Sequence, residues 1–116
     1  MDFPLYIKEI WLFKEAIDFR KGKASLINHI LKEKKTPNEG LYLFINKRKD
    51  KIKGLCWHKN GFLVIWKELE QGKFALELEP SKTSYHMNNE ELVWLLAGLP
   101  WQRMKQWGDK VFQKFS

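Results

Sequence analysis

Three apolar runs between residues 41 and 74 form the clearest hydrophobic pattern in the chain. They cover residues 41–45, 52–57 and 62–69. A basic segment, residues 46–50, separates the first two runs, and the dipeptide Asn60-Gly61 separates the second from the third. Asn-Gly between two strand-like runs is typical of a two-residue hairpin turn, because both residues tolerate the positive φ of that turn. The pattern predicts a three-stranded antiparallel meander with a positively charged tip.

If that dipeptide forms the turn, counting outward sets the register of the hairpin. Lys53 then lies opposite Glu68, and Lys51 lies opposite Glu70. Each such pair of opposite charges contributes roughly 0.2–1 kcal/mol, and a slip by one residue would lose both pairs and reverse the two faces. Apolar residues on both faces of the middle run predict a central strand with other elements packed on each side.

Helical spacing predicts two helices outside the meander. Four aliphatic residues recur at helical spacing over about residues 21–34, and a breaker-rich loop follows at 36–40. A second helix is predicted over residues 88–97. Asn88 can cap its N-terminus, Glu91 completes a capping-box pattern, and Gly98 and Pro100 end it.

The remaining segments are shorter or less regular. Residues 10–13 are expected to form a first strand. Residues 73–79 are expected to form a fourth strand, and residues 80–84 a turn or loop. The tail, residues 102–116, is amphipathic and is interpreted as a docked helix, with an interaction helix as the alternative. The expected fold is therefore one α+β domain over residues 1–116. Its mainly antiparallel sheet of three to five strands packs against two or three helices.

Charge narrows the choice of partners. The chain has 21 Lys and Arg against 14 Asp and Glu, a formal net charge of +7. An excess of this size favours a polyanion such as nucleic acid, although a solvated basic surface is the alternative interpretation. The single cysteine, Cys56, indicates a reducing compartment and is expected to be a buried small hydrophobe. Without an apolar leader or an apolar run of about 20 residues, the chain is expected to be cytoplasmic, with no membrane contact.

Several short motifs resemble one protein family when they are taken in order along the chain. They are Trp11, Asp18-Phe19-Arg20-Lys21-Gly22, Asp50-Lys51-Ile52-Lys53, Trp57, Asn60-Gly61-Phe62, the run from Lys67 to Phe74, Leu92, Leu95-Leu96, Gly98 and Trp101.

Their combination is similar to the accessory protein encoded by the second reading frame of the sixty-six family of bacterial insertion sequences, often labelled TnpB. The resemblance covers roughly residues 10–101. It implies a role in transposition beside a separate, larger transposase, and so a possible partnership with that transposase or another element-encoded protein.

The basic tip of the meander is the leading candidate for contact with DNA. Lys47, Arg48 and Lys49 are consecutive, and Lys59 lies in the next turn. Phosphate contacts need charge more than exact geometry, so these cations suit a DNA backbone. The alternative is a solvated loop. Lys51 and Lys53 are assigned a structural role in cross-strand ion pairs.

Arg20 and Lys21 form a second candidate anion site at the start of the first predicted helix. The alternative, given equal weight, is that Arg20 pairs with Asp18 or Asp50 and fixes the helix against the hairpin. Among the tryptophans, Trp57 is the best candidate for stacking on a base, but core packing is the commoner role for such residues.

Catalysis finds little support. His29, His58 and His86 lack the spacing of a metal site, and the glycines form no phosphate-binding loop. Asp18 and Asp50 are better explained as helix-start and turn residues than as nuclease carboxylates. We expect no enzyme activity and no cofactor. The sequence predicts a non-catalytic transposition accessory factor that binds DNA; the alternative is a protein adaptor for the transposase without DNA contact.

Overall fold

The computed structural model describes residue 7 and residues 9–104, which contain five strands and two helices. In chain order these are β1 (Ile10–Phe13), α1 (Lys23–Lys32), β2 (Leu41–Ile45), β3 (Lys51–His58), β4 (Gly61–Glu68), β5 (Ser84–Met87) and α2 (Asn89–Leu96). A further helical turn spans residues 101–104. The predicted α+β class is confirmed. The predicted tail helix falls mostly on residues 105–116, outside the described part of the chain.

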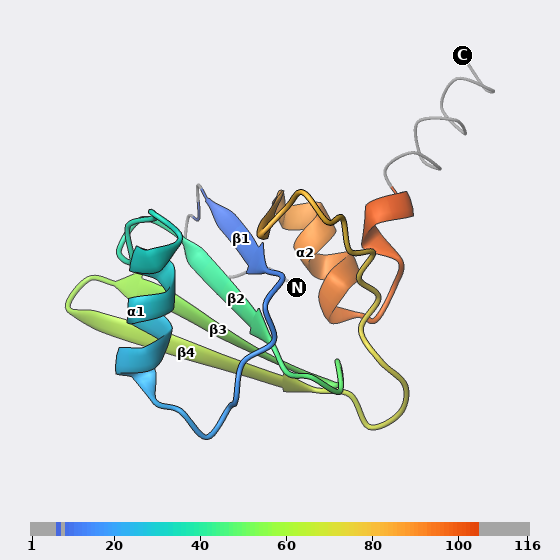
Figure 1. Ribbon diagram of the computed structural model, residues 1–116, viewed down its shortest axis with the longest axis horizontal. Coiled ribbons are helices and arrows are strands. Elements are labelled where there is room, and N and C mark those ends of the chain that lie inside the picture. The colour runs from blue at the N-terminus through green and yellow to red at the C-terminus, as the bar shows by residue number, and fades with distance from the viewer. Residues whose placement is uncertain (1–6, 8, 105–116) are drawn as a thin grey trace, which may run out of the picture.

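The strands form one sheet in the order β4-β3-β2-β1-β5 (Figure 1). The predicted meander of β2, β3 and β4 is confirmed, with antiparallel pairing throughout. β1 lies parallel to β2, as a crossover through α1 requires, and β5 pairs antiparallel with the other edge of β1. The sheet is mixed but mainly antiparallel.

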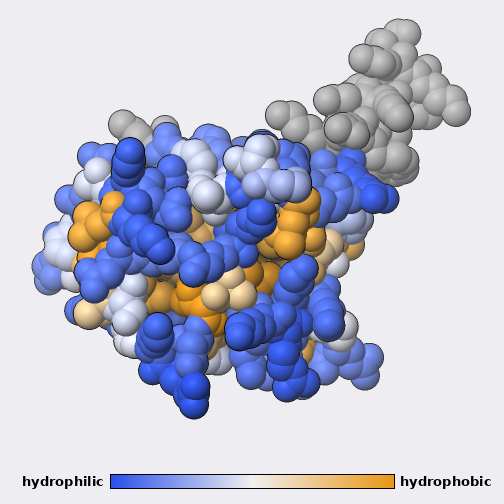
Figure 2. Space-filling model, in the orientation of Figure 1, coloured by the Kyte–Doolittle hydropathy of each residue, from blue (hydrophilic) through white to orange (hydrophobic). Residues whose placement is uncertain are grey.

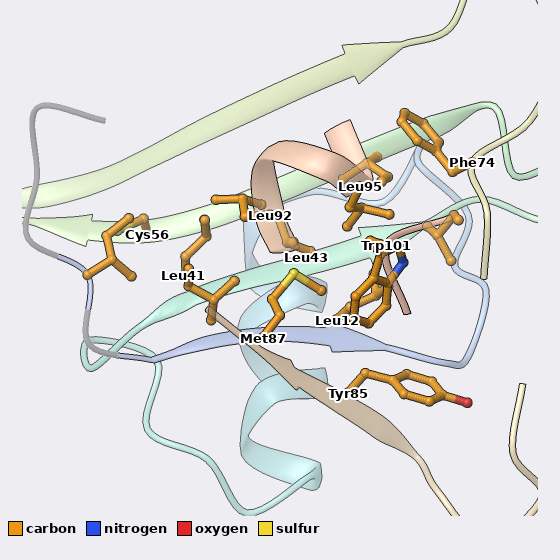
Figure 3. Close-up of a cluster of buried hydrophobic side chains, with 14 residues drawn as sticks. Leu12, Leu41, Leu43, Cys56, Phe74, Tyr85, Met87, Leu92, Leu95 and Trp101 are labelled. Atoms are coloured by element: carbon orange, nitrogen blue, oxygen red, sulfur yellow. The ribbon is translucent and has the colours of Figure 1, made fainter. Parts of the chain in front are cut away.

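Hydrophobic clusters cover both faces of the sheet. On one face, Leu92 and Leu95 of α2 pack against a cluster that includes Leu41 and Leu43 of β2 (Figure 3). On the other face, Leu26 and Ile30 of α1 pack against a second cluster with Tyr42, Phe44 and Leu55 among its members. β2 is buried along its whole length because both clusters use it. β3 contributes to both clusters as well, so the predicted central position of that run is confirmed.

The predicted register of the β3–β4 hairpin is wrong by two residues. Its turn consists of Lys59 and Asn60, Gly61 already belongs to β4, and Trp57 lies opposite Phe62. Lys59 rather than Gly61 adopts the positive φ, at 53°. The Trp57 and Phe62 rings meet edge to face with centroids 5.0 Å apart, a cross-strand contact that the predicted register would lose.

The shift replaces the predicted charge pairs. Lys51 faces Glu68, with Nζ 3.8 Å from Oε1, instead of Glu70. Lys53 faces Trp66 instead of Glu68. Because side chains alternate with a period of two, a shift of two residues leaves every side chain on its predicted face.

One expectation for the segment after the meander was also wrong. Residues 73–79 form no strand. Trp101 Nε1 donates to the Ala75 carbonyl at 3.0 Å, and the Gln102 side chain bonds the backbone of Glu77, so side chains take the place of a neighbouring strand. The loop predicted over residues 80–84 is confirmed for residues 80–83, and residues 84–87 form β5, in which Tyr85 and Met87 are buried.

Both predicted helices are confirmed with shorter bounds. α2 has the full capping box: Glu91 N–H donates to Asn88 Oδ1 at 2.8 Å, and Asn88 N–H donates to Glu91 Oε1 at 3.1 Å. Gly98 follows it with φ of 78°. α1 ends in the same kind of motif, with Lys34 at φ of 60° and the Lys35 N–H donating to the Ile30 carbonyl. Within the described residues, no helix has the length and apolarity needed to cross a membrane.

Candidate nucleic-acid interface

The turn between β2 and β3 presents two exposed cations, Lys47 and Arg48. The Asn46 side chain builds this turn, since Asn46 Oδ1 accepts the backbone N–H groups of Asp50 and Lys51 at 3.1 and 3.0 Å. Asn46 Nδ2 also donates to Asp50 Oδ1 at 2.6 Å, and this bond lowers the pKa of the Asp50 carboxyl. Asp50 is therefore a turn residue, and the two cations stand on a fixed backbone.

The loop before α1 brings a third cation to the same place. The Ile17 N–H donates to the Ile45 carbonyl at 3.1 Å, which ties this loop to the end of β2. Arg20 is bound to Asp18: its Nε lies 3.0 Å from each carboxylate oxygen and its Nη2 lies 2.7 Å from Oδ2. Hydrogen bonds from Arg20 lower the pKa of Asp18 to about 2. Of the two pairings expected for Arg20, the structure has the one with Asp18.

These two segments, together with Lys51 of β3 and Trp66 of β4, line an open cleft of about 520 Å³. Arg20, Lys47, Arg48 and Lys51 supply four cations to its lining, against the single carboxylate of Asp18. We refer to it as the basic cleft, lined by Ile17, Asp18, Phe19, Arg20, Asn46, Lys47, Arg48, Lys51 and Trp66. It lies on the α1 side of the sheet. On the face seen in Figure 2, which α1 partly covers, hydrophobic surface lies between groups of hydrophilic side chains.

Trp66 is the residue of this cleft that the sequence did not single out. It projects from β4, is 51 % exposed, and meets Phe19 edge to face with ring centroids 5.5 Å apart. Lys53 Nζ lies 5.7 Å from the centre of the Trp66 ring. The predicted register did not place Trp66 opposite Lys53, because it paired Lys53 with Glu68. Counted from a Lys59-Asn60 turn, the sequence would have placed Trp66 opposite a lysine.

Three of the predicted site residues lie outside the basic cleft. Lys21 is exposed and lines a separate, smaller hollow beside α1. Lys49 is half-buried at φ of 60°, and its carbonyl accepts the Phe74 N–H at 2.7 Å. Lys59 lies in the turn at the far end of β3 from Lys51, about 25 Å along the strand.

The remaining candidates for stacking or chemistry occupy structural positions. Trp57 is 39 % exposed but packs edge to face on Phe62, and Trp101 is buried in the α2-side core. Cys56 is a buried free cysteine, and burial raises the pKa of its thiol. Among the residues that the structure describes, no three His, Cys, Asp or Glu side chains are grouped so that they could hold a metal ion.

Comparison with known proteins identifies the family of the chain. The family model described as IS66 Orf2 like protein matches residues 8–106. The uncharacterized protein y4jC of Sinorhizobium fredii is 33 % identical over 103 residues, covering 84 % of each chain. No solved structure matches the chain. The chain thus belongs to the IS66 Orf2-like family of bacterial insertion sequences, whose members have an accessory role in transposition.

Proposed function

We propose that the protein is a non-catalytic accessory factor of insertion-sequence transposition that binds DNA through the basic cleft. One observation carries this proposal: Arg20 and the pair Lys47 and Arg48 come from separate segments and line the same cleft. Cations gathered on one surface neutralise several phosphates together and release the counterions that those phosphates held.

The Asp18–Arg20 pair determines how much each cation contributes to phosphate binding. Asp18 holds Arg20 through both carboxylate oxygens, so a phosphate would have to displace or share that partner. Lys47 and Arg48 are exposed at the tip of the turn. They therefore supply most of the attraction, while Arg20 contributes less than a free arginine would.

The test is fluorescence anisotropy of a labelled duplex that carries the terminal repeat of the parent element, measured over a series of salt concentrations. We expect the logarithm of the affinity to fall linearly with the logarithm of salt concentration. Changing Lys47 and Arg48 together to Ala should lower the magnitude of that slope by about 2. A scrambled duplex of equal length reports whether the repeat itself is preferred.

Lys32 and Lys34 provide the matched control. Both are exposed at the C-terminal end of α1, whereas Arg20 precedes the N-terminal end. Changing this pair to Ala removes the same charge from outside the basic cleft, so it should alter the slope far less. Equal effects of the two double substitutions would show that only net charge matters and would contradict the proposed site.

The adaptor role is favoured by a different observation, the outer edge of β4. In the described part of the chain β4 pairs with β3 alone, and Leu63 and Val64 are 44 % and 51 % exposed on it. An exposed apolar edge strand can accept a strand from another protein. Leu63→Lys should then weaken binding of the purified transposase of the same element, measured by calorimetry. Unchanged binding would exclude this edge as the contact.

A further inference from the structure

Trp66 is a large aromatic side chain that folding leaves half exposed. It lies on the α1 face of β4, opposite Lys53 and in the lining of the basic cleft. Burying a large apolar side chain stabilises a protein, and the sequence forgoes part of that gain at Trp66, which is 51 % exposed. An exposed aromatic ring that shares a cleft with cations is the arrangement that base stacking requires.

The Trp66 ring is held in place rather than loosely exposed. Phe19 meets it at an interplanar angle of 68°, and Lys53 Nζ lies 5.7 Å from its centre. Phe19 itself packs against the α1-side core cluster, so the loop before α1 supports the ring from one side. A ring that is oriented before its ligand arrives loses little conformational freedom on binding.

We propose that the basic cleft receives an unpaired DNA base stacked on Trp66, with the flanking phosphates on Arg20, Lys47 and Arg48. This inference rests on the proposed DNA-binding function and makes it specific to single-stranded DNA. Proteins that bind single strands combine an aromatic platform with a cationic groove in this way.

A stacking tryptophan distinguishes paired from unpaired DNA. In a duplex each base face is covered by its neighbours in the stack, and only base edges and phosphates are accessible. A duplex can therefore use the cations of the cleft but not the face of Trp66. A cleft of about 520 Å³ is within the range of about 300–1,000 Å³ that ligand sites occupy, which leaves room for one base and its sugar.

Charge favours a polyanion over a neutral or basic peptide for this cleft, because four cations and one carboxylate line it. The neutral polar side chain in the lining, Asn46, already bonds Asp50 and Lys51. It is committed to the turn and does not select for a ribose 2′-hydroxyl, the group by which proteins recognise RNA. The transposition role of the family then assigns the strand as DNA.

The test compares a labelled oligothymidine of about 12 nucleotides with a labelled duplex of the same length by fluorescence anisotropy, since single-strand-binding OB-fold domains, which serve as the guide to length, cover about 4–16 nucleotides. Trp66→Ala should weaken binding of the oligothymidine by about 5- to 100-fold. It should leave duplex binding within about twofold. Trp66→Phe keeps an aromatic face and should retain most of the single-strand affinity.

Leu78→Ala provides the matched control, since it removes an exposed apolar side chain from outside the basic cleft. It should leave both affinities unchanged. A second readout avoids truncation of Trp66: the tryptophan fluorescence of the wild type minus that of Trp66→Phe. Oligothymidine should quench this difference signal and the duplex should not.

The outcomes separate this inference from the proposed function. Absence of salt-sensitive binding by both oligothymidine and duplex would overturn both proposals. Binding of both with equal affinity, dependent on Lys47 and Arg48 but indifferent to Trp66, would overturn only the stacking site. A stronger affinity for an oligouridine of the same length would overturn the assignment to DNA.

Discussion

Asn46 and Asp50 are bonded to each other across the β2–β3 turn, with Asn46 Nδ2 donating to Asp50 Oδ1 at 2.6 Å. The Oδ1 atom of the same Asn46 side chain accepts the backbone N–H groups of Asp50 and Lys51. One amide thus makes three hydrogen bonds in a turn whose tip carries Lys47 and Arg48. The geometry of the cationic tip depends on this residue more than on the cations themselves.

Asn46→Ala should lower the free energy of unfolding by about 1–3 kcal/mol, because backbone N–H groups and a carboxylate lose their partner. Urea denaturation measures the change, and Asn38→Ala, at an exposed loop asparagine, serves as the control. Affinity for the duplex should fall even though no charge is removed. A variant with lost stability and wild-type affinity would show that the turn need not be rigid for binding.

Lys59 occupies the left-handed region that favours glycine, with φ of 53°. A non-glycine residue there is strained by roughly 1–2 kcal/mol. Lys59→Gly should therefore raise the midpoint of thermal unfolding, whereas Lys67→Gly in β4 should lower it, because glycine weakens a strand. Destabilisation by Lys59→Gly would mean that the hairpin turns at Asn60-Gly61 after all.

Gly40 allows a close approach between the start of β2 and the chain before β1. A Cβ at this position would lie 2.6 Å from the Glu9 carbonyl oxygen, which accepts the Leu41 N–H. Gly40→Ala should destabilise the protein by about 1–3 kcal/mol in urea denaturation. Gly61→Ala should be close to neutral, since an added Cβ there meets nothing within 4 Å. Equal costs at the two positions would contradict this packing.

The Asp18–Arg20 pair predicts an acid-range titration. Arg20 holds the folded-state pKa of Asp18 near 2, below the ordinary value of 3.8. Because the folded pKa is depressed, the pair contributes stability above about pH 4, and this contribution is lost as the pH falls toward 2. Carbon NMR of the Asp18 carboxyl should give a midpoint of about 2, which Arg20→Ala should move up toward 3.8. An unchanged midpoint in that variant would show that Arg20 is not the cause.

The elements that follow local rules were predictable from the sequence. The capping box at Asn88 and Glu91 defines the start of α2, and apolar runs separated by turn residues define β2, β3 and β4. The hairpin register was not predictable, because it was set by a strained Lys59 and by the contact between Trp57 and Phe62. Turn propensity alone favoured Asn-Gly, and tertiary packing outweighed it.

The candidate site was predicted only in part, because some of its residues are brought together by contacts between distant segments. Adjacent cations such as Lys47 and Arg48 are visible in any sequence. The approach of Arg20 to them depends on a hydrogen bond between Ile17 and Ile45, which no local pattern encodes. Trp66 was missed because tryptophan is buried far more often than exposed, and its exposure follows from the edge position of β4. The edge position of β4 follows from the strand order, which depends on the whole chain and not on the sequence around Trp66.

The position of β1 between β2 and β5 has a consequence for synthesis on the ribosome. The meander of β2, β3 and β4 pairs strands that are neighbours in sequence, so it can form as soon as residue 68 has emerged. The outer edge of β1 remains unpaired until Ser84–Met87 has been synthesised, because Ile10 pairs with Met87. A nascent chain that stalls between these points carries an unpaired strand edge and an α2-side core that still lacks Leu92, Leu95 and Trp101, and exposed strand edges and apolar surface of this kind favour aggregation.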